Sequence, residues 1–349
     1  MRKIAALLLV LLVLGVFGDR AYEWVNWQVY TPTSTASRPV LVTIPAGASQ
    51  DELATTLSGK GLIRDRNVFL NYLRWLRVRG EGLRLRAGAF ELNRDMSMAR
   101  IVQQLQHGAI AQVTVRMGEG DTLAAMAEEA ARQGAGTAQD YRAAASDIAQ
   151  WPSYAFLKDR PASAPRNLEG FLYPDTYRLV RGSPAKTLVQ RQLDRFGSVF
   201  TPQMRAQAAR PTDARPAESV YSIVILASIV EKEVEKNSDR GLVCDVFYNR
   251  LAQGMELGSD ATVLYAVGKS SGTPTQADLQ VSSPYNTRKY PGLPPGPISN
   301  PSIGAIQACL TPPKTAYLYF FTDPQGAAHY AATYDEFLRQ QQQYGLAGQ

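Results

Sequence analysis

The pattern of apolar positions begins with an uninterrupted run near the N-terminus. Residues 4–17 are fourteen uncharged, mostly apolar positions preceded by Arg2 and Lys3. The aromatic residues that follow the run are Tyr22, Trp24 and Trp27. Such flanks are typical of a membrane-crossing segment whose N-terminus is cytoplasmic. We predict a transmembrane anchor over residues 1–21 and a linker over 22–38; because the run is short, a cleaved signal peptide is the alternative.

A second pattern, a strand followed by a glycine-containing turn and a helix, occurs twice. Residues 39–44 read as a β-branched strand, and Ser49 with Glu52 forms a capping-box sequence before a helix. At an offset of 73 residues, a similar turn and helix return over residues 118–134. The repeat predicts a small βαβ-type or LysM-like module over residues 39–135. Chance similarity between two common segments is the alternative.

Arginine is concentrated between the two copies. Residues 67–79 have apolar side chains at helical spacing, and seven arginines lie within residues 64–86. Such a cluster suits contact with anionic lipid or wall polymer, and a solvated helix face is the alternative. The net charge of +6 also favours anionic surroundings, without indicating nucleic acid.

The second half of the chain, residues 136–349, is predicted to form a mixed α/β domain, which makes the chain α+β overall. Helices are predicted over residues 184–196, 219–237 and 240–253, and a β-hairpin near residues 317–330. The first half of the second of these helices is almost wholly apolar, which is typical of a buried helix.

Scarce histidine and cysteine narrow the chemistry. The two histidines, His107 and His329, are far apart and form no metal-binding motif, so we predict no metal and no cofactor. A serine–histidine–aspartate triad would have to use one of them. Cys244 and Cys309 form no CxxC motif, which argues against thiol redox chemistry. We interpret both as small buried residues, with a disulfide as the alternative.

The apolar helix of residues 219–237 ends in three acidic residues, Glu231, Glu233 and Glu235. At 100° per residue, Glu231 continues an apolar stripe of the helix. Burial there would raise its pKa, and a carboxyl that stays protonated can act as a general acid. Glu231 is therefore a candidate catalytic residue, whereas Glu233 points to the opposite side and is predicted to be structural. The alternative is that all three form the solvated end of the helix.

The loop of residues 283–301 is a candidate sugar-binding segment. Five prolines lie within residues 291–301 and make the loop rigid, because proline fixes φ. Tyrosine and asparagine on such a loop suit sugars, and an ordered surface loop is the alternative. Asp260 has a comparable ambiguity, because it could simply cap the helix that begins near Thr262.

These segments together resemble the membrane-anchored endolytic murein transglycosylase family. The motifs that carry the resemblance are Ala227-Ser-Ile-Val-Glu231-Lys-Glu, Phe247-Tyr-Asn249-Arg250-Leu, Ser259-Asp260-Ala-Thr262-Val-Leu-Tyr265, Tyr285-Asn286-Thr287, Gly292-Leu-Pro-Pro-Gly296-Pro-Ile and Glu169-Gly-Phe-Leu-Tyr-Pro174-Asp175-Thr-Tyr177. The resemblance covers nearly the whole chain from about residue 39. One departure is Ala261, where the family usually has proline.

The resemblance implies a short anchor, a LysM-like module and a catalytic domain over residues 136–349 with a buried catalytic helix. It implies endolytic cleavage of the MurNAc–GlcNAc bond in nascent glycan strands, which leaves 1,6-anhydro ends during cell wall assembly. It carries the family's catalytic glutamate onto Glu231. The implied partners are glycan strands, membrane lipid and peptidoglycan synthases, with no nucleic acid.

A lytic transglycosylase needs only one carboxylate. We predict that Glu231 protonates the leaving glycosidic oxygen and then deprotonates the C6 hydroxyl of the same sugar, which attacks in place of water. The side chains predicted to position the sugar or polarise the acid are Asn249, Asp260, Tyr285, Asn286 and Tyr319. Two alternatives stay open: a non-catalytic, membrane-anchored peptidoglycan-binding scaffold, and a hydrolase that pairs Glu231 with Asp260 or Glu235.

Overall fold

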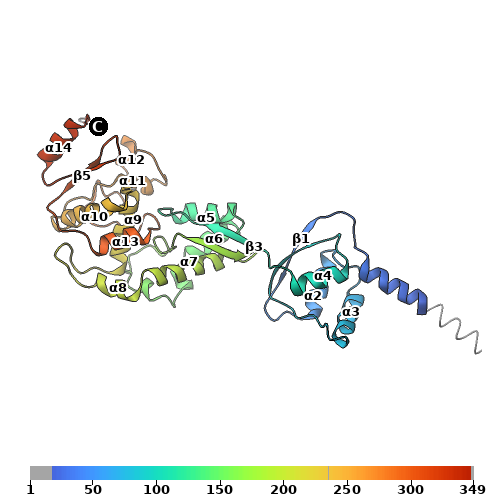
Figure 1. The fold of residues 1–349 in the computed structure, drawn as a ribbon. Coiled ribbons are helices and arrows are strands. Elements are labelled where there is room, and N and C mark those ends of the chain that lie inside the picture. The colour runs from blue at the N-terminus through green and yellow to red at the C-terminus, as the bar shows by residue number, and fades with distance from the viewer. Residues whose placement is uncertain (1–17, 235, 347–349) are drawn as a thin grey trace, which may run out of the picture. The chain divides into compact units, whose positions relative to one another are not determined.

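The computed structural model describes residues 18–234 and 236–346 (Figure 1). They form two compact units. Unit 1 ends at Val113 and includes residues 180–182, and unit 2 comprises residues 114–179 and those from Ser183 onward. Within the described residues the fold is mostly helical, with three two-stranded sheets. The prediction of a mixed α+β chain is confirmed at this level.

The segment predicted as a linker over residues 22–38 is partly helical. Residues 18–30 are helical, and only residues 31–38 are irregular. The helix packs on unit 1 near its C-terminal end, where Val29 is buried in the core. The apolar run of residues 4–17 lies outside the described residues. Among the helices that are described, none combines the length and the apolar content needed to cross a bilayer.

Unit 1 has two antiparallel strands separated in sequence by two helices. Its elements are β1 (Pro39–Ile44), α2 (Gln50–Gly59), α3 (Arg66–Val78), β2 (Gly88–Asn93) and α4 (Met98–His107). Pro39 pairs with Asn93 and Ile44 with Gly88. The predicted βαβ-type arrangement is wrong here, because that unit has parallel strands and a single crossover helix. Here the two consecutive helices return the chain in the opposite direction.

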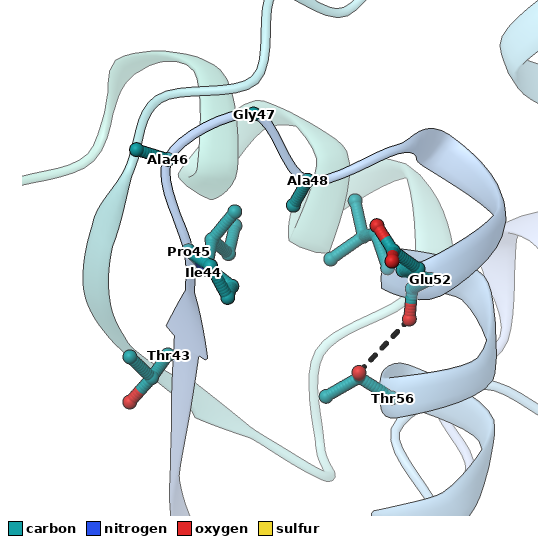
Figure 2. Close-up of a pocket in the computed structure, with 9 residues that line it drawn as sticks. Thr43, Ile44, Pro45, Ala46, Gly47, Ala48, Glu52 and Thr56 are labelled. Atoms are coloured by element: carbon teal, nitrogen blue, oxygen red, sulfur yellow. Dashed lines mark hydrogen bonds between the residues drawn. The ribbon is translucent and has the colours of Figure 1, made fainter.

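Both copies of the sequence repeat form a turn followed by a capped helix. Ser49 and Glu52 make the predicted capping box before α2. Thr122 caps α5 (Leu123–Arg132) in the second copy. The turn before each helix contains a glycine with positive φ, 79° at Gly47 and 72° at Gly120, a conformation that side chains disfavour. In the first copy this turn borders a hollow of about 350 Å³ (Figure 2).

The two copies nevertheless belong to different units. The boundary falls between residues 113 and 114, within the module predicted over residues 39–135. The reason lies in the packing, because α5 contributes Met126 and Ala127 to the interior of unit 2, where α5 packs on α6 (Ala138–Ala145). The similarity of the copies is therefore local.

Unit 2 is built around α9 (Val220–Glu233), which is buried along most of its length, as its apolar sequence predicted. Helices α8, α10, α11 and α13 all contact it. The further elements that lie wholly or mostly in this unit are β3 (Gln112–Arg116), η1 (Ile148–Gln150), η2 (Ala155–Leu157), β4 (Thr176–Val180), α7 (Ala185–Val199), α8 (Pro202–Ala208), α10 (Asn237–Ala252), α11 (Asp260–Ala266), α12 (Gln276–Leu279), α13 (Ile303–Leu310), β5 (Tyr319–Thr322), β6 (Ala328–Ala331) and α14 (Tyr334–Gln343). Strands β5 and β6 form the predicted hairpin.

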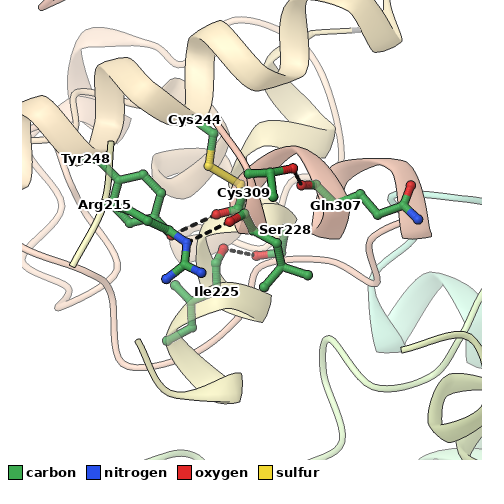
Figure 3. The surroundings of a disulfide bond; sticks show 9 residues. Arg215, Ile225, Ser228, Cys244, Tyr248, Gln307 and Cys309 are labelled. Atoms are coloured by element: carbon green, nitrogen blue, oxygen red, sulfur yellow. Dashed lines mark hydrogen bonds between the residues drawn. A yellow bond between two sulfur atoms is a disulfide. The ribbon is translucent and has the colours of Figure 1, made fainter. Parts of the chain in front are cut away.

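A disulfide joins Cys244 on α10 to Cys309 on α13 (Figure 3). The interpretation of the two cysteines as separate buried residues is therefore wrong, and the alternative holds. The residues are 65 positions apart, and their Cα atoms lie 5.4 Å from each other because α10 and α13 both pack on α9. The bond ties together two of the helices that surround α9.

Candidate active site

The last turn of α9 places Glu231 and Glu233 in separate surroundings. The helix ends at Glu233 because Val234 has an extended backbone, with φ −139° and ψ 132°. This is four positions before the predicted end. Glu235, the third acidic residue of the segment, lies outside the described residues.

Glu231 is buried in a network of donors. Its side chain is 5% exposed and accepts a hydrogen bond of 2.5 Å from the guanidinium of Arg240. The backbone N–H and hydroxyl of Ser302 donate to its other oxygen at 2.9 and 2.6 Å. Arg240 also donates to the Ser302 hydroxyl at 2.7 Å. Burial of Glu231 was predicted correctly, but the carboxylate is occupied by an arginine and by the N-cap residue of α13.

Glu233 instead lines a cavity. The cavity has a volume of about 290 Å³, and its wall also includes Asp260, Tyr265, Lys232 and Lys269. Burial raises the pKa of the Glu233 carboxyl, and the nearby charge of Asp260 raises it further. A hydrogen bond from the hydroxyl of Ser259 opposes this shift. A carboxyl whose pKa is raised beside a cavity is suited to general acid chemistry.

Ser259 is held in place by two buried threonines. Its backbone N–H donates to the hydroxyl of Thr287 at 3.2 Å, and the Thr262 hydroxyl donates to its carbonyl at 2.7 Å. The two threonine hydroxyls lie 2.8 Å apart. The Ser259–Tyr265 motif and the Tyr285–Thr287 motif are therefore connected, and together they fix the hydroxyl that contacts Glu233.

A third carboxyl, Glu169, lies at an adjoining hollow of about 410 Å³. The two hollows share four wall residues, Thr122, Tyr265, Lys269 and Ser270. Burial raises the pKa of Glu169 to about 8. Hydrogen bonds from the Leu123 N–H at 2.8 Å, the Asn300 amide at 2.9 Å and the Tyr265 hydroxyl at 3.3 Å partly offset that effect. Tyr265 thus belongs to both walls and contacts one of the buried carboxyls.

The five predicted positioning residues divide into two groups. Asp260 lines the Glu233 cavity and accepts a hydrogen bond of 2.5 Å from Arg288. The Tyr285 ring lies 5.0 Å from the ring of Tyr265, a cavity wall residue. The others contact parts of the protein away from this wall.

Those other residues support the fold. The Asn249 amide donates to the carbonyls of residues 315 and 317, which joins α10 to the segment before β5. The buried Asn286 amide donates to the carbonyls of residues 279 and 281. The Tyr319 ring packs 5.3 Å from the guanidinium of Arg250. None of the three lines the two hollows described above.

Sequence reasoning overlooked Glu233, Ser259 and Glu169 as members of a site. Ser259 and Glu169 belong to motifs that carry the family resemblance. Their local spacing does not indicate that they lie beside a cavity. For Glu233, a signal was available in the alternation of the two glutamates around the helix. That signal does not separate the two residues by function, because the ion pair of Glu231 with Arg240 on the next helix is not visible in the sequence.

The chain is thus a two-unit α+β protein with a carboxyl-lined cavity at the end of a buried helix. It belongs to the YceG-like family, whose model matches residues 42–343. This confirms the family predicted from the motifs, since relatives carry the name endolytic murein transglycosylase.

Two such relatives come from Bacillus subtilis and Streptococcus pneumoniae. The Bacillus subtilis protein is 30% identical over 87% of this chain and 84% of its own length. The Streptococcus pneumoniae D39 protein is 29% identical over 96% of this chain, and the match spans only 64% of that relative. A crystal structure of a yceG-like protein from Listeria monocytogenes is also similar. It is 32% identical, with a TM-score of 0.58 over 87% of this chain and all of that chain.

Proposed function

We propose that this protein is an endolytic lytic transglycosylase of peptidoglycan and that Glu233, rather than Glu231, is its general acid and base. The observation that carries the assignment is the position of Glu233 on a cavity wall, with a pKa raised by burial. Glu231 has no comparable access, because Arg240 and Ser302 occupy its carboxylate. The names of the relatives support the substrate and the reaction class.

In the proposed reaction, the protonated Glu233 gives its proton to the glycosidic oxygen between MurNAc and GlcNAc. The C1–O bond breaks and leaves an oxocarbenium-like centre on MurNAc. The Glu233 carboxylate then takes the proton of the C6 hydroxyl, and O6 bonds to C1. The products are a GlcNAc hydroxyl end and a 1,6-anhydro-MurNAc end, and no water is consumed. The intramolecular hydroxyl makes a second catalytic carboxylate unnecessary.

A hydrolase is the second candidate, because Asp260 lines the same cavity. Hydrolytic glycosidases use two carboxyl groups, one of them as nucleophile or base. Asp260 is poorly suited to that task, since it is paired with Arg288 and both side chains are 45% exposed. The contact favours a positioning role for Asp260 and the one-carboxyl mechanism for Glu233.

Product analysis tests these proposals. Purified glycan strands are incubated with the full chain in water enriched in ¹⁸O, and the products are measured by mass spectrometry. Anhydro ends without ¹⁸O are expected from the lyase. Reducing ends that carry ¹⁸O would establish the hydrolase instead. Intact strands that stay bound to the protein would support the peptidoglycan-binding scaffold.

We also propose that the chain is a single-pass membrane protein with a cytoplasmic N-terminus and both units outside the cytoplasm. The apolar run of residues 4–17 after Arg2 and Lys3 supports this topology. The Cys244–Cys309 disulfide supports it independently, because such bonds persist in oxidising compartments. Reporter fusions at the two termini test it: a C-terminal alkaline phosphatase should be active, and an inactive one would reject the topology.

A further inference from the structure

Unit 1 exposes an unusual amount of aromatic surface. Seven of the eleven large, exposed apolar side chains among the described residues lie between residues 22 and 78. The helix of residues 18–30 and α3 together line a hollow of about 410 Å³. We call six exposed apolar residues the aromatic face: Tyr22, Trp24, Val25, Tyr30 and Trp75, which line this hollow, and Val78, three positions after Trp75 on α3.

The aromatic face combines rings that suit one particular environment. Soluble proteins rarely leave large contiguous apolar patches in water. Trp75 is 45% exposed and Val78 is 88% exposed, on the side of α3 that does not face the core. Tryptophan and tyrosine are enriched where hydrocarbon meets lipid headgroups, because their rings are apolar and their edges are polar. The hollow itself has few groups for a glycan, since its wall adds only the amides of Asn26 and Asn71 to the tyrosine hydroxyls.

Unit 1 differs from the rest of the chain in its net charge. Residues 1–113 contain fourteen Lys and Arg against eight Asp and Glu, whereas residues 114–349 contain 23 of each. The whole net charge of +6 is therefore carried by the first 113 residues. Exposed arginines flank the aromatic face at α3. Arg74 lies three positions after Asn71, which lines the hollow, and the guanidinium of Arg79, the residue directly after α3, lies 4.6 Å from the Trp75 ring. Basic groups beside aromatic rings match an anionic lipid surface.

The position of the face in the chain points to the same partner. The apolar run of residues 4–17 ends directly before the helix of residues 18–30, which contributes four of the six residues of the aromatic face. That run is short for a membrane span, so an interfacial contact next to it would add to the attachment. Trp75 lies about fifty residues further on and lines the same hollow only through the fold of unit 1.

We propose that unit 1 docks on an anionic lipid bilayer through the aromatic face, with α3 lying at the level of the headgroups. The four tryptophans of the chain allow a test on the full protein. Trp24, Trp27 and Trp75 belong to unit 1, and the buried Trp151 belongs to unit 2. The chain is reconstituted into vesicles of phosphatidylcholine and phosphatidylglycerol whose acyl chains carry bromine, and the quenching of tryptophan emission is measured.

The substitution Trp75→Phe is expected to remove roughly half of the quenchable emission, because it removes one of the two tryptophans of the aromatic face. Trp151→Phe is the matched control and should leave the quenchable emission unchanged. Arg74→Glu should reduce the contribution of Trp75, whereas Arg100→Glu, at an exposed arginine of α4, should not. Circular dichroism checks that each variant is folded.

Three results would overturn the proposal. In the first, Trp75→Phe leaves the quenchable emission unchanged, which places α3 away from lipid. In the second, Trp75 is quenched equally in vesicles without phosphatidylglycerol, which removes the role given to the arginines. In the third, soluble glycan strands change the Trp75 emission and brominated lipid does not, which identifies the face as a wall-polymer surface.

Discussion

The two sides of the last turn of α9 differ in what surrounds their carboxyl groups. On one side, Glu231 meets an arginine, a hydroxyl and a backbone N–H within 2.9 Å. On the other side, Glu233 meets a single hydroxyl and an open cavity. Both carboxyl groups are screened from solvent. Glu231 forms an ion pair with Arg240, whereas burial raises the pKa of Glu233. Burial alone therefore does not identify an acid catalyst. The groups that contact the buried carboxyl determine whether it can act as one.

The largest expected effect is on catalysis. Glu233→Gln should lower the rate of anhydro-end formation by about 10²–10⁴-fold, because an amide cannot transfer a proton. The variant should remain folded, since glutamine can still accept the hydrogen bond from Ser259. Rates are measured by chromatography of released anhydro products. Glu231→Gln serves as the matched comparison at an equal folded fraction; if it proved the more damaging change, the catalytic role would return to Glu231.

The next effect is on stability and concerns Glu231. Glu231→Ala should lower the free energy of unfolding by about 3–5 kcal/mol, because it leaves the charge of the buried Arg240 unpaired. Chemical denaturation followed by circular dichroism measures the change. The double variant Glu231→Leu with Arg240→Met should recover much of the loss. Equal stability of Glu231→Ala and the parent protein would contradict the ion-pair role.

The contrast between the two glutamates also shows where the sequence was sufficient. The almost wholly apolar first half of α9 predicted a buried helix, and the motifs predicted the family. The capping box at Ser49 and the hairpin of β5 and β6 follow from short-range chemistry and were likewise predictable.

What the sequence could not supply were contacts between distant segments. The pairing of Glu231 with Ser302 spans 71 positions, and the disulfide spans 65. The wall formed by Glu169 and Tyr265 joins residues 96 positions apart. No local periodicity encodes such distances, because they depend on how α10, α11 and α13 pack around α9.

A pH effect extends the comparison to Glu169. Its folded pKa of about 8 lies above the ordinary glutamate value of 4.5, so the folded state holds a proton that the unfolded chain releases. This contribution to stability is complete below pH 4.5 and is lost as the pH rises to about 8. The slope should approach about 1.4 kcal/mol per pH unit between these values. Denaturation at several pH values measures it.

Glu169→Gln separates this contribution from the other groups. The amide stays neutral, so the part of the slope due to Glu169 should disappear while the variant remains folded at high pH. A slope that is identical in the variant and the parent protein would show that Glu169 ionises normally. The raised pKa of Glu233 acts in the same direction, and Glu233→Gln provides the parallel measurement.

The smallest expected effect concerns the Ser259 hydroxyl, which donates to the Glu233 carboxyl. The hydrogen bond from Ser259 lowers the pKa of Glu233, so Ser259→Ala should raise that pKa. Because the general acid must be protonated, the alkaline limb of the kcat/KM profile should move to higher pH by the same amount.

Thr287→Val is the companion change, because it removes the hydroxyl that accepts from the Ser259 backbone N–H without touching Glu233. A smaller shift in the same direction would mean that the threonine pair positions the serine. An alkaline limb that does not move in Ser259→Ala would mean that another group titrates in the rate-limiting step, and the contrast between the two sides of α9 would then be one of structure alone.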